Sequence, residues 1–400
     1  MNKSILDNDV QEFISNNLET DVFQLILKKQ LFPKVSNKEI AEQITAKSKS
    51  KNKLPSWYNT SGIYFPNKIN IEQTSSEQTA EFKSSIVSGY KMIDCTGGFG
   101  VDSYYFSRKF KSVTYIERDE SLCSITKLNS DKLGIINTIH LNEDGLEYAQ
   151  NIKTEFDLLY VDPSRRDLKN KKVHFLSECT PVINSSVIKS LSNFKTILIK
   201  CSPIIDIKKT VNDLEIVKDV YIIGINNEVK EVLISLDRIG KIKLKINCID
   251  LSDRNNDFIF DFNEINNKEN TFTSETQKYL YEPNSMILKS GAFNLICDRY
   301  KVNKLNPNSH LYTSNELKKF PGRVFEIEKT VSYNKKNLKS LNVLKANITT
   351  RNFPVEVKDI RRKNKIKDGG EDYLFFTTNN LGKLIIIKTK KKLIVTPRSS

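Results

Sequence analysis

The sequence has 400 residues, more than a single hydrophobic core usually serves, so two or three domains are expected. Its six cysteines are scattered without a C-x-x-C pair, which argues against a disulfide framework and against a zinc site. No stretch approaches the ~18 apolar residues of a membrane span, and the first residues lack the apolar core of a signal peptide. These features argue against membrane and disulfide-rich secreted proteins, and we expect a cytoplasmic protein without a metal.

The basic charge is concentrated near one end of the chain. Sixty-three basic and forty-eight acidic residues give a formal charge of +15, and the segment from Lys335 to Ser400 holds seventeen of the former and five of the latter. Such an asymmetric charge favours a polyanionic partner, nucleic acid above all. The alternative is a lysine-rich composition that places lysine on any solvated face.

The first seventy residues predict a small helical domain. Apolar residues recur at helical spacing between Asp7 and Lys29, which predicts one amphipathic helix. Ser36, with Glu39 three residues later, has the spacing of a capping box and marks the start of a second helix. The basic stretch Lys47–Lys53 is typical of a solvated linker that follows this helix.

From Lys91 onward, short apolar runs rich in β-branched residues alternate with helical stretches. This alternation predicts the parallel strands of an open, Rossmann-like α/β sheet. Two more apolar runs within Val220–Leu236 are separated by only a short polar turn, so we expect an antiparallel hairpin that ends the sheet. The five predicted parallel strands are Lys91–Cys95, Ser112–Glu117, Asn137–Leu141, Phe156–Asp162 and Lys195–Cys201.

The region beyond Asp250 predicts a boundary followed by a second folded part. Residues 252–277 are polar and rich in asparagine, which is typical of a boundary or a long loop. Strand-like runs then recur, and we expect a small α+β module from about residue 277 onward. Its predicted elements are a strand and a helix within Tyr279–Ile296 and the strands Arg323–Ile327, Leu341–Asn347, Tyr373–Thr378 and Leu384–Lys388.

A glycine-rich turn follows the first predicted strand, in the sequence Asp94-Cys-Thr-Gly-Gly-Phe-Gly-Val-Asp102. Gly97, Gly98 and Gly100 allow the backbone to turn sharply and to approach a ligand closely. Glu117 ends the second predicted strand at nearly the usual spacing of roughly twenty residues from such a turn. An acid at that position can accept hydrogen bonds from the two hydroxyl groups of a ribose.

The segment Gly98-x-Gly100-x-x-Ser103 is also nearly a dinucleotide fingerprint, so NAD must be weighed against S-adenosylmethionine. A pyrophosphate is dianionic and prefers an unopposed helix N-terminus. Asp94 and Asp102 flank this turn, and their charges suit a ligand that carries an ammonium and a sulfonium group. Ser103 also replaces the third glycine of the dinucleotide pattern. The sequence therefore favours S-adenosylmethionine.

Asp144 follows the third predicted strand and could accept a hydrogen bond from the amino group of adenine. The dipeptide Asp144-Gly145 is equally typical of a plain turn. The predicted donor-binding residues are Asp94, Thr96, Gly97, Gly98, Gly100, Asp102, Glu117, Asp144 and Asp162.

The fourth predicted strand ends in Asp162-Pro-Ser-Arg-Arg166, at the sheet edge where open α/β proteins bind ligands. We expect Asp162 to accept a proton or a hydrogen bond from the acceptor group. Arg165 and Arg166 can hold a phosphate or a carboxylate, or else cap the next helix or bridge to another domain. Lys200, at the end of the fifth strand, is a candidate for substrate phosphate or for a structural ion pair.

Three strings, Asp94–Ser103, Tyr115–Leu122 and Tyr160–Asp167, resemble a class I methyltransferase family that carries a THUMP-like carboxyl-terminal domain and occurs in Bacteroidetes-type bacteria. Later strings such as Ala346–Pro354 and Lys367–Gly370 agree with the same family. The resemblance implies a helical domain at 1–72, a methyltransferase domain at 73–276, a ferredoxin-like segment at 277–322 and a THUMP-like domain at 323–400.

By analogy with THUMP domains, which bind RNA, the resemblance implies that the carboxyl-terminal module holds an RNA, either tRNA or rRNA. One departure concerns the acceptor. Enzymes that methylate base amines often end the fourth strand in Asn/Asp-Pro-Pro-aromatic, whereas Ser164 and Arg165 occupy the last two positions here, which puts amine methylation in doubt. The implied RNA-binding residues are Arg351, Arg361, Arg362, Lys363 and Lys365.

The leading hypothesis is an S-adenosylmethionine-dependent methyltransferase of RNA, with Asp162, Arg165 and Arg166 facing the acceptor. The alternatives are a methyltransferase of a small molecule or a protein, and a non-catalytic RNA-binding protein that retains the donor pocket. A nicotinamide enzyme is a more distant alternative.

Overall fold

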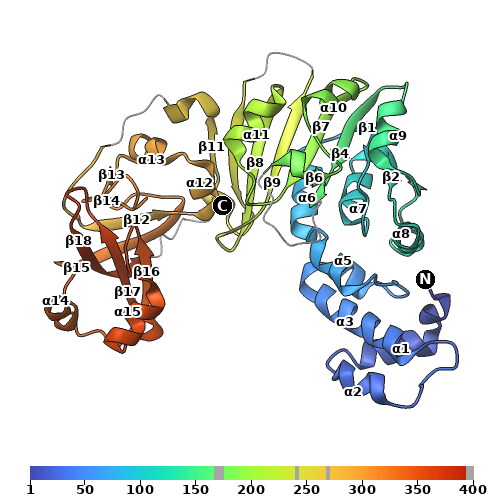
Figure 1. Ribbon diagram of the computed structural model, residues 1–400, viewed down its shortest axis with the longest axis horizontal. Helices are drawn as coiled ribbons and strands as arrows, with labels where there is room; N and C mark the ends of the chain where they lie inside the picture. Colours follow the sequence, from blue (N-terminus) through green and yellow to red (C-terminus); the bar gives the residue numbers. More distant parts are fainter. Residues whose placement is uncertain (166–174, 239–242, 267–270, 393–400) are drawn as a thin grey trace, which may run out of the picture. The chain divides into compact units, whose positions relative to one another are not determined.

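The computed structural model describes residues 1–165, 175–238, 243–266 and 271–392 (Figure 1). The chain divides into two compact units. The first comprises Met1–Lys218 and the described part of Val232–Ile242, and the second comprises Asp219–Glu231 and the described residues from Lys243 onward. Among the described helices, none combines the length and the apolar composition that crossing a bilayer requires.

The amino-terminal segment contains two helices where the sequence predicts one between Asp7 and Lys29. After a short 3-10 turn at Lys3–Leu6, α1 (Asn8–Asn16) and α2 (Val22–Leu27) are separated by five residues. Asn17 ends α1, because its side-chain amide donates to the Phe13 carbonyl at 2.8 Å, and Asp21 caps α2 by accepting from the Phe23 amide at 3.0 Å. Polar side chains that satisfy helix ends thus interrupt the apolar period.

The third helix begins as predicted and continues further than predicted. In α3 (Asn37–Lys53), Ser36 and Glu39 form the expected capping box. The predicted linker Lys47–Lys53 is wrong, because this stretch is the last part of α3. Ser50 is fully buried and its hydroxyl donates to the Ala46 carbonyl at 2.9 Å, so one side of the basic stretch belongs to the core. Two short helices follow, α4 (Pro55–Asn59) and α5 (Lys68–Gln73).

The five predicted parallel strands are confirmed, and so is the Rossmann-like fold class. In the described sheet the strand order is β11-β10-β8-β9-β7-β4-β1-β2-β3. β1 pairs in parallel with β2 and β4, β2 with β3, and β4 with β7. The strands are β1 (Gly89–Asp94), β2 (Phe110–Ile116), β3 (Thr138–Leu141), β4 (Phe156–Val161) and β7 (Phe194–Cys201). The helices between and around them are α6 (Glu77–Ser85), α7 (Val101–Ser107), α8 (Glu120–Lys132), α9 (Gly145–Asn151), α10 (Ser185–Ser190) and α11 (Ile207–Leu214).

The predicted hairpin exists, but the sheet does not end there. β8 (Val217–Ile225) and β9 (Glu228–Asp237) form the hairpin, and β9 runs antiparallel to β7. β10 (Lys245–Asp250) then pairs in parallel with β8, and β11 (Phe258–Asp261) pairs antiparallel with β10. The polar region predicted as a boundary therefore contains a strand, because Phe258 and Phe260 alternate with exposed positions and bury one face.

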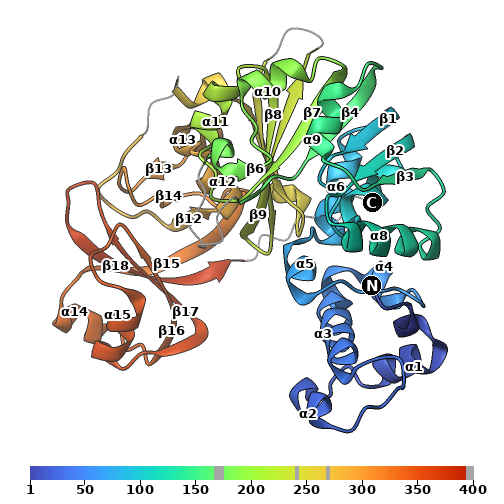
Figure 2. The same ribbon diagram turned by 45° about the vertical axis from the view of Figure 1, so that its right-hand side comes forward.

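The carboxyl-terminal module is a second sheet, with the described order β13-β14-β12-β15-β18-β17-β16. The single helix predicted after the first strand is two helices, which are separated at the left-handed Gly291. The predicted strand Leu341–Asn347 begins only at Lys345, because Leu338 and Leu341 pack into the core at the end of a helix. The elements are β12 (Tyr279–Pro283), α12 (Ser285–Ser290), α13 (Phe293–Tyr300), β13 (Asn303–Lys304), β14 (Tyr312–Ser314), β15 (Gly322–Ser332), α14 (Lys335–Ser340), β16 (Lys345–Arg351), α15 (Val357–Asn364), β17 (Lys367–Thr378) and β18 (Leu384–Lys392). Figures 1 and 2 both show α15 beside β16 and β17.

Candidate active site

The glycine turn, Thr96–Gly100, joins β1 to α7 and is held from both sides. Gly98 and Gly100 have φ of 55° and 78°, which glycine adopts at no steric cost. A Cβ on Gly97 would lie 2.2 Å from the ring of Tyr115, so this position also requires glycine. The Gly98 carbonyl accepts hydrogen bonds from the Tyr115 hydroxyl at 2.6 Å and from the Thr126 hydroxyl at 3.1 Å. The turn therefore has a fixed backbone.

Glu117 lies directly beside this turn, as its position after the second strand predicts. One carboxylate oxygen accepts from the Gly98 amide at 2.9 Å, and the other accepts from the Asp119 amide at 2.9 Å. The Asn142 side chain donates to the carbonyls of Glu117 and Arg118, which ties the loop after β3 to the loop after β2. A half-buried carboxylate is thus held at the edge of the turn with lone pairs left for a ligand.

Asp94 is buried at the end of β1, with 1% of its surface exposed. Burial raises its pKa to about 7, against a hydrogen bond from Ser103, and the negative charges of Asp102 and Asp162 add to the rise. The Ser103 hydroxyl donates to Asp94 at 2.5 Å, so the residue that replaces the third glycine serves to hold this carboxyl. A cation bound above the turn would stabilise its ionised form.

Asp102, in the first turn of α7, is engaged by the protein itself. It accepts from the hydroxyls of Ser75 and Tyr160, each at 2.8 Å, and its other oxygen lies 3.2 Å from the amine of Lys83, whose side chain is fully buried. Burial raises the pKa of Asp102, but Lys83 and Lys200 outweigh this effect and the pKa lies below its ordinary value. Asp102 therefore joins α6, β4 and α7 as an ionised group.

Asp162, Thr96 and Lys200 come together at the ends of β1, β4 and β7. The Asp162 amide donates to the Thr96 hydroxyl at 2.7 Å, and the Asp162 carboxylate forms an ion pair with Lys200 at 2.5 Å. Lys200 thus forms an ion pair, which is one of the two roles that the sequence leaves open for it. About a third of the Asp162 side chain (34%) stays exposed, so the carboxylate is open to a ligand on one side.

Asp144 is the N-cap of α9, where it accepts from the Glu147 amide at 2.9 Å, and its second oxygen forms an ion pair with Arg118. The dipeptide Asp144-Gly145 thus starts a helix and is not a plain turn. Gly145 is required because a Cβ there would lie 2.1 Å from the Cys95 carbonyl. Asp144 also lines a cavity of about 530 Å³ that α9 and the loop before it form.

The other predicted residues are less close to this site or lie outside the described residues. Arg166 lies outside them, and of Arg165 only the backbone is described, in the two-residue strand β5 (Ser164–Arg165) that pairs with β6 (Cys179–Thr180). In the second unit, three predicted RNA-binding arginines have partners within the module. Arg351 pairs with Glu282, Arg361 with Asp368 and Arg362 with Asp359, whereas Lys363 and Lys365 are exposed.

Several residues around the site were missed by the sequence reasoning. Phe99 within the glycine turn packs against Trp57 and Phe65 of the amino-terminal segment. Lys53, at the end of α3, donates to the carbonyls of Ile71 and Glu72, and burial together with the charge of Lys200 lowers its pKa to about 8. In the sequence, the signal for this packing is Phe99 itself, a large apolar residue between Gly98 and Gly100.

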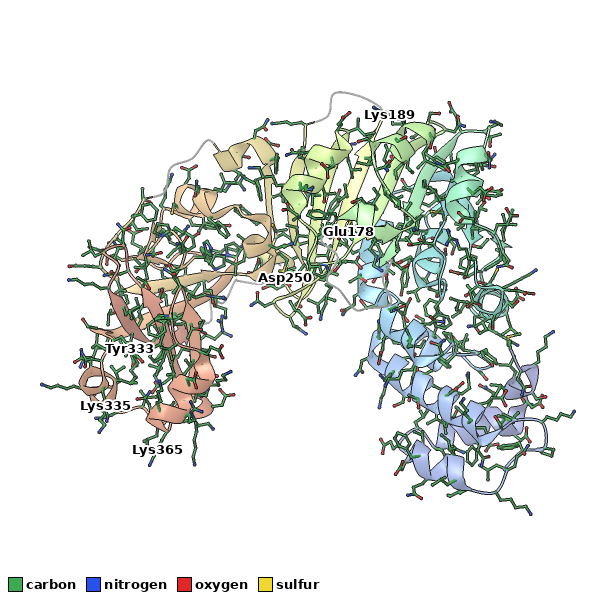
Figure 3. All side chains as sticks on the ribbon, in the orientation of Figure 1. Glu178, Lys189, Asp250, Tyr333, Lys335 and Lys365 are labelled. Atoms are coloured by element: carbon green, nitrogen blue, oxygen red, sulfur yellow. The ribbon has the colours of Figure 1, made fainter. Side chains whose placement is uncertain are left out.

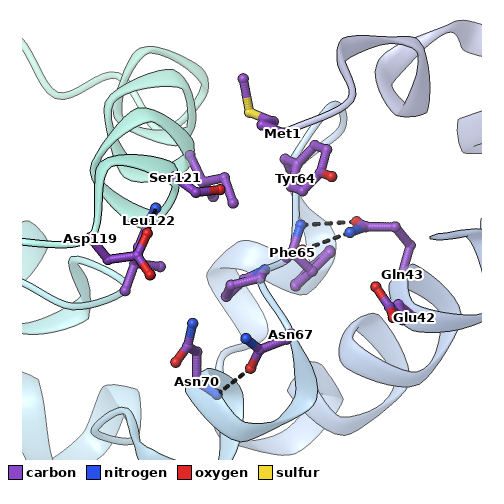
Figure 4. A pocket seen from close by; sticks show the side chains of 12 residues that line it. Met1, Glu42, Gln43, Tyr64, Phe65, Asn67, Asn70, Asp119, Ser121 and Leu122 are labelled. Atoms are coloured by element: carbon purple, nitrogen blue, oxygen red, sulfur yellow. Dashed lines mark hydrogen bonds between the residues drawn. The ribbon is translucent and has the colours of Figure 1, made fainter.

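A second cavity of about 200 Å³ is lined by the amino-terminal segment and by the start of α8 (Figure 4). Gln43 shapes its wall by exchanging two hydrogen bonds with the backbone of Phe65, and Asp119 lies across from them. Across the described ranges, no group of three or more His, Cys, Asp or Glu side chains is arranged to hold a metal ion.

Comparison with known proteins agrees with this geometry. Residues 77–218 match the family described as conserved hypothetical protein 95, residues 279–321 match a ferredoxin-like domain, and residues 322–391 match a THUMP-like domain. The crystal structure of a "putative methyltransferase" from Porphyromonas gingivalis W83 is 32% identical over 98% of this chain and 99% of that chain, with a TM-score of 0.89. The chain belongs to this methyltransferase family. The resemblance stated from the sequence is confirmed, and the protein is a methyltransferase.

One curated relative is named as an RNA methyltransferase. An uncharacterized RNA methyltransferase of Mycoplasma mobile is 30% identical to the methyltransferase over 90 residues. These residues are 22% of this chain and 25% of the relative, so the chain spans about a quarter of the relative's length.

Proposed function

We propose that the methyltransferase binds S-adenosylmethionine as its methyl donor at the glycine turn, with Glu117 accepting hydrogen bonds from the ribose hydroxyls. The observation that carries this proposal is the bond from the Gly98 amide to Glu117, which places an acceptor carboxylate directly against a turn in which three of the five residues are glycines. The space that a side chain of residue 98 would occupy is open to a ligand, because the nearest atom to a Cβ built on Gly98 lies 3.8 Å away. Asp144 would accept from the adenine amino group through a lone pair that its cap and Arg118 leave free.

The charges around the turn fit a cationic donor better than a dinucleotide. Asp94 lies at the end of β1, and Glu117 follows β2 directly. A pyrophosphate would meet these carboxylates with like charge, whereas an ammonium and a sulfonium meet opposite charge. When bound, the donor supplies a methyl group on a positively charged sulfur, which needs alignment with the acceptor more than a strong base.

On the acceptor side, Asp162 is the group that we assign to the acceptor's hydrogen bond or proton. Its amide is fixed by Thr96 and one of its oxygens by Lys200, so the remaining open side of the carboxylate has a defined direction. Lys200 places a positive charge against the Asp162 carboxylate. Arg165 and Arg166 follow directly and would add phosphate or carboxylate contacts.

The donor assignment is tested by titrating the purified protein with S-adenosylmethionine, S-adenosylhomocysteine and NAD in a calorimeter. We expect micromolar binding of the first two and no binding of NAD, because only the first two lack a pyrophosphate. Binding of NAD alone would mean that the turn is a dinucleotide site and that the donor proposal is wrong.

We further propose RNA as the acceptor. Residues 322–391 match a THUMP-like domain, and the Mycoplasma relative is named an RNA methyltransferase. The surplus of basic residues falls in the same module, where Lys335 projects from α14 and Lys365 from the end of α15 (Figure 3). Phosphate groups of an RNA are the natural counter-charges for such a surface.

A small-molecule or protein acceptor is the second candidate, and one observation favours it. Much of the basic charge of the module is neutralised internally, since Arg351, Arg361 and Arg362 are paired with carboxylates. Lys388, Lys390 and Lys392 on β18 are paired as well. A salt-independent activity on a metabolite or a protein would support this candidate over RNA.

A further inference from the structure

The glycine turn contains one large side chain, and the amino-terminal segment buries it. Phe99 is 3% exposed, and its ring centre lies 6.0 Å from that of Trp57 and 6.5 Å from that of Phe65. Trp57 belongs to α4, and Phe65 to the stretch that leads into α5. The two residues therefore precede the sheet in sequence but pack on the turn.

The segment that carries Trp57 and Phe65 is bound firmly to the helices beside the turn. Glu77 of α6 accepts from the amide of Ser56 at 2.6 Å, from its hydroxyl at 2.7 Å and from the hydroxyl of Tyr105 on α7 at 2.7 Å. Tyr64 exchanges two hydrogen bonds with the side chain of Asn129 on α8, each at 2.9 Å. The position of Trp57 is therefore set relative to α6, α7 and α8.

Anchoring of Phe99 has an energetic consequence for ligand binding. Three of the five residues of the turn, Gly97, Gly98 and Gly100, are glycines, which lose the most conformational freedom when a ligand orders them. A side chain fixed in a hydrophobic core removes much of that freedom before the ligand arrives, and a pre-organised site binds more tightly. Phe99 is the only residue of the turn that can supply a large apolar anchor.

Trp57 also shows an uncommon feature for a residue of the core. It is 1% exposed, and its indole N–H is buried without a hydrogen-bond partner within the part of the chain that the structure describes. A buried donor without a partner is unfavourable. The ring nevertheless contacts Tyr104 of α7 at 4.9 Å as well as Phe99, so the aromatic contact, and not the N–H, accounts for its place in the structure.

We infer that Trp57 is a positioning residue of the methyl-donor site, which acts by holding Phe99 and thereby the glycine turn, without touching the donor. This inference rests on the donor site proposed above. The amino-terminal segment around residues 54–67 then forms a working part of the methyltransferase site. The sequence boundary at residue 72 does not separate it from the catalytic domain in function.

Calorimetric titration with S-adenosylhomocysteine tests this role. Trp57→Ala should weaken binding about tenfold, and Trp57→Phe, which keeps a ring and removes the unpaired N–H, should bind within about twofold of the wild type. The matched control is Ile14→Ala, since Ile14 is 1% exposed in the separate apolar cluster of α1, α2 and α3. It should lower the melting temperature but leave the dissociation constant unchanged.

A second measurement uses the wild-type protein and needs no variant. If the packing of Trp57 favours binding of the donor, thermodynamic reciprocity requires that the bound donor stabilises the packing of Trp57. S-adenosylhomocysteine should therefore slow amide hydrogen exchange in residues 54–65, and it should leave exchange in α1 and α2 unchanged. This comparison decides the question if Trp57→Ala does not fold.

The inference is overturned if Trp57→Ala folds and binds like the wild type, or if saturating S-adenosylhomocysteine leaves exchange in residues 54–65 unaltered. An equal loss of affinity in Ile14→Ala would also overturn it, because the effect would then follow stability alone. Failure of the wild type to bind S-adenosylhomocysteine would instead overturn the proposed donor site.

Discussion

At the scale of single residues, the candidate active site combines carboxylates that differ in environment. Asp94 is buried and has a pKa raised to about 7, whereas the partners of Asp102 keep its pKa below the ordinary value. Asp162 remains partly exposed and paired with Lys200. We therefore propose distinct roles for the three groups: Asp94 responds to bound charge, Asp102 anchors helices and Asp162 faces the acceptor.

Donor binding should depend on pH through Asp94. Below its pKa of about 7, Asp94 is largely protonated, and a bound cation favours the ionised form, so binding should release protons at pH 6 and affinity should rise up to about pH 7. Calorimetry in two buffers of different ionisation enthalpy measures this release. In Asp94→Asn the release and the pH dependence should disappear; a pH-independent wild type would contradict the prediction.

The raised pKa of Asp94 also makes the stability of the protein depend on pH. Between pH 4 and pH 7 the unfolded chain releases the Asp94 proton while the folded protein keeps it, so this residue costs increasing stability as the pH rises. Asp94→Asn should therefore gain melting temperature relative to the wild type across that range. Equal slopes for the two proteins would show that Asp94 ionises normally.

Asp162→Ala should abolish turnover and spare donor binding. The sequence counts Asp162 among the donor-binding residues as well, but we assign its carboxylate to the acceptor, because the proposed donor contacts are with the glycine turn, Glu117 and Asp144. We expect a loss of kcat of about 100-fold or more, the usual range for a general base, with the affinity for S-adenosylhomocysteine changed less than threefold. Turnover at the wild-type rate would refute the assignment.

At the scale of elements, buried charge joins strands of the carboxyl-terminal module. Glu282 on β12 has a side chain that is 3% exposed, and it accepts from Arg323 on β15 and from Arg351 at the end of β16. Arg351, which the sequence suggests for RNA, is therefore committed to a carboxylate of its own module. Removal of one member of such a buried group leaves the others without compensation.

Glu282→Gln should destabilise this module by about 1.5–3 kcal/mol, the range for hydrogen bonds to charged groups, because two partly exposed arginines would lose a buried counter-charge. Urea unfolding followed by circular dichroism measures the effect. Glu356→Gln is the control, because the Glu356–Lys358 pair is exposed, and it should change the unfolding midpoint little. A midpoint for Glu282→Gln equal to that of the control would contradict the structural role.

At the scale of the whole molecule, the proposed RNA acceptor predicts a steep dependence of binding on salt. Each lysine that neutralises a phosphate releases a counterion, so the logarithm of the affinity should fall linearly with the logarithm of salt concentration. Lys363 and Lys365 are exposed, and the double variant Lys363→Gln/Lys365→Gln should reduce the slope by about 2. Lys208→Gln, an exposed lysine of α11, should leave it unchanged, and salt-insensitive binding would exclude the RNA proposal.

The sequence determined those features of this protein that depend on local periodicity and spacing. Alternating apolar runs predicted the parallel strands, the Ser36 capping box predicted the start of α3, and the position of Glu117 was predicted at the end of the second strand. These features depend on residues that lie within one helix, one strand or one turn of the sequence, so no contact between distant residues is needed to specify them.

Only the tertiary structure decided which partner each charged or aromatic side chain has. Lys83 lies opposite Asp102, Lys200 pairs with Asp162 and Trp57 packs on Phe99, across separations of nineteen to forty-two residues. The basic stretch at the end of α3 became helix because one face of it is buried, which its composition does not reveal. Such pairings depend on how distant elements pack. A charged or polar side chain loses its hydration only when these elements bury it, and only then does it need a particular partner.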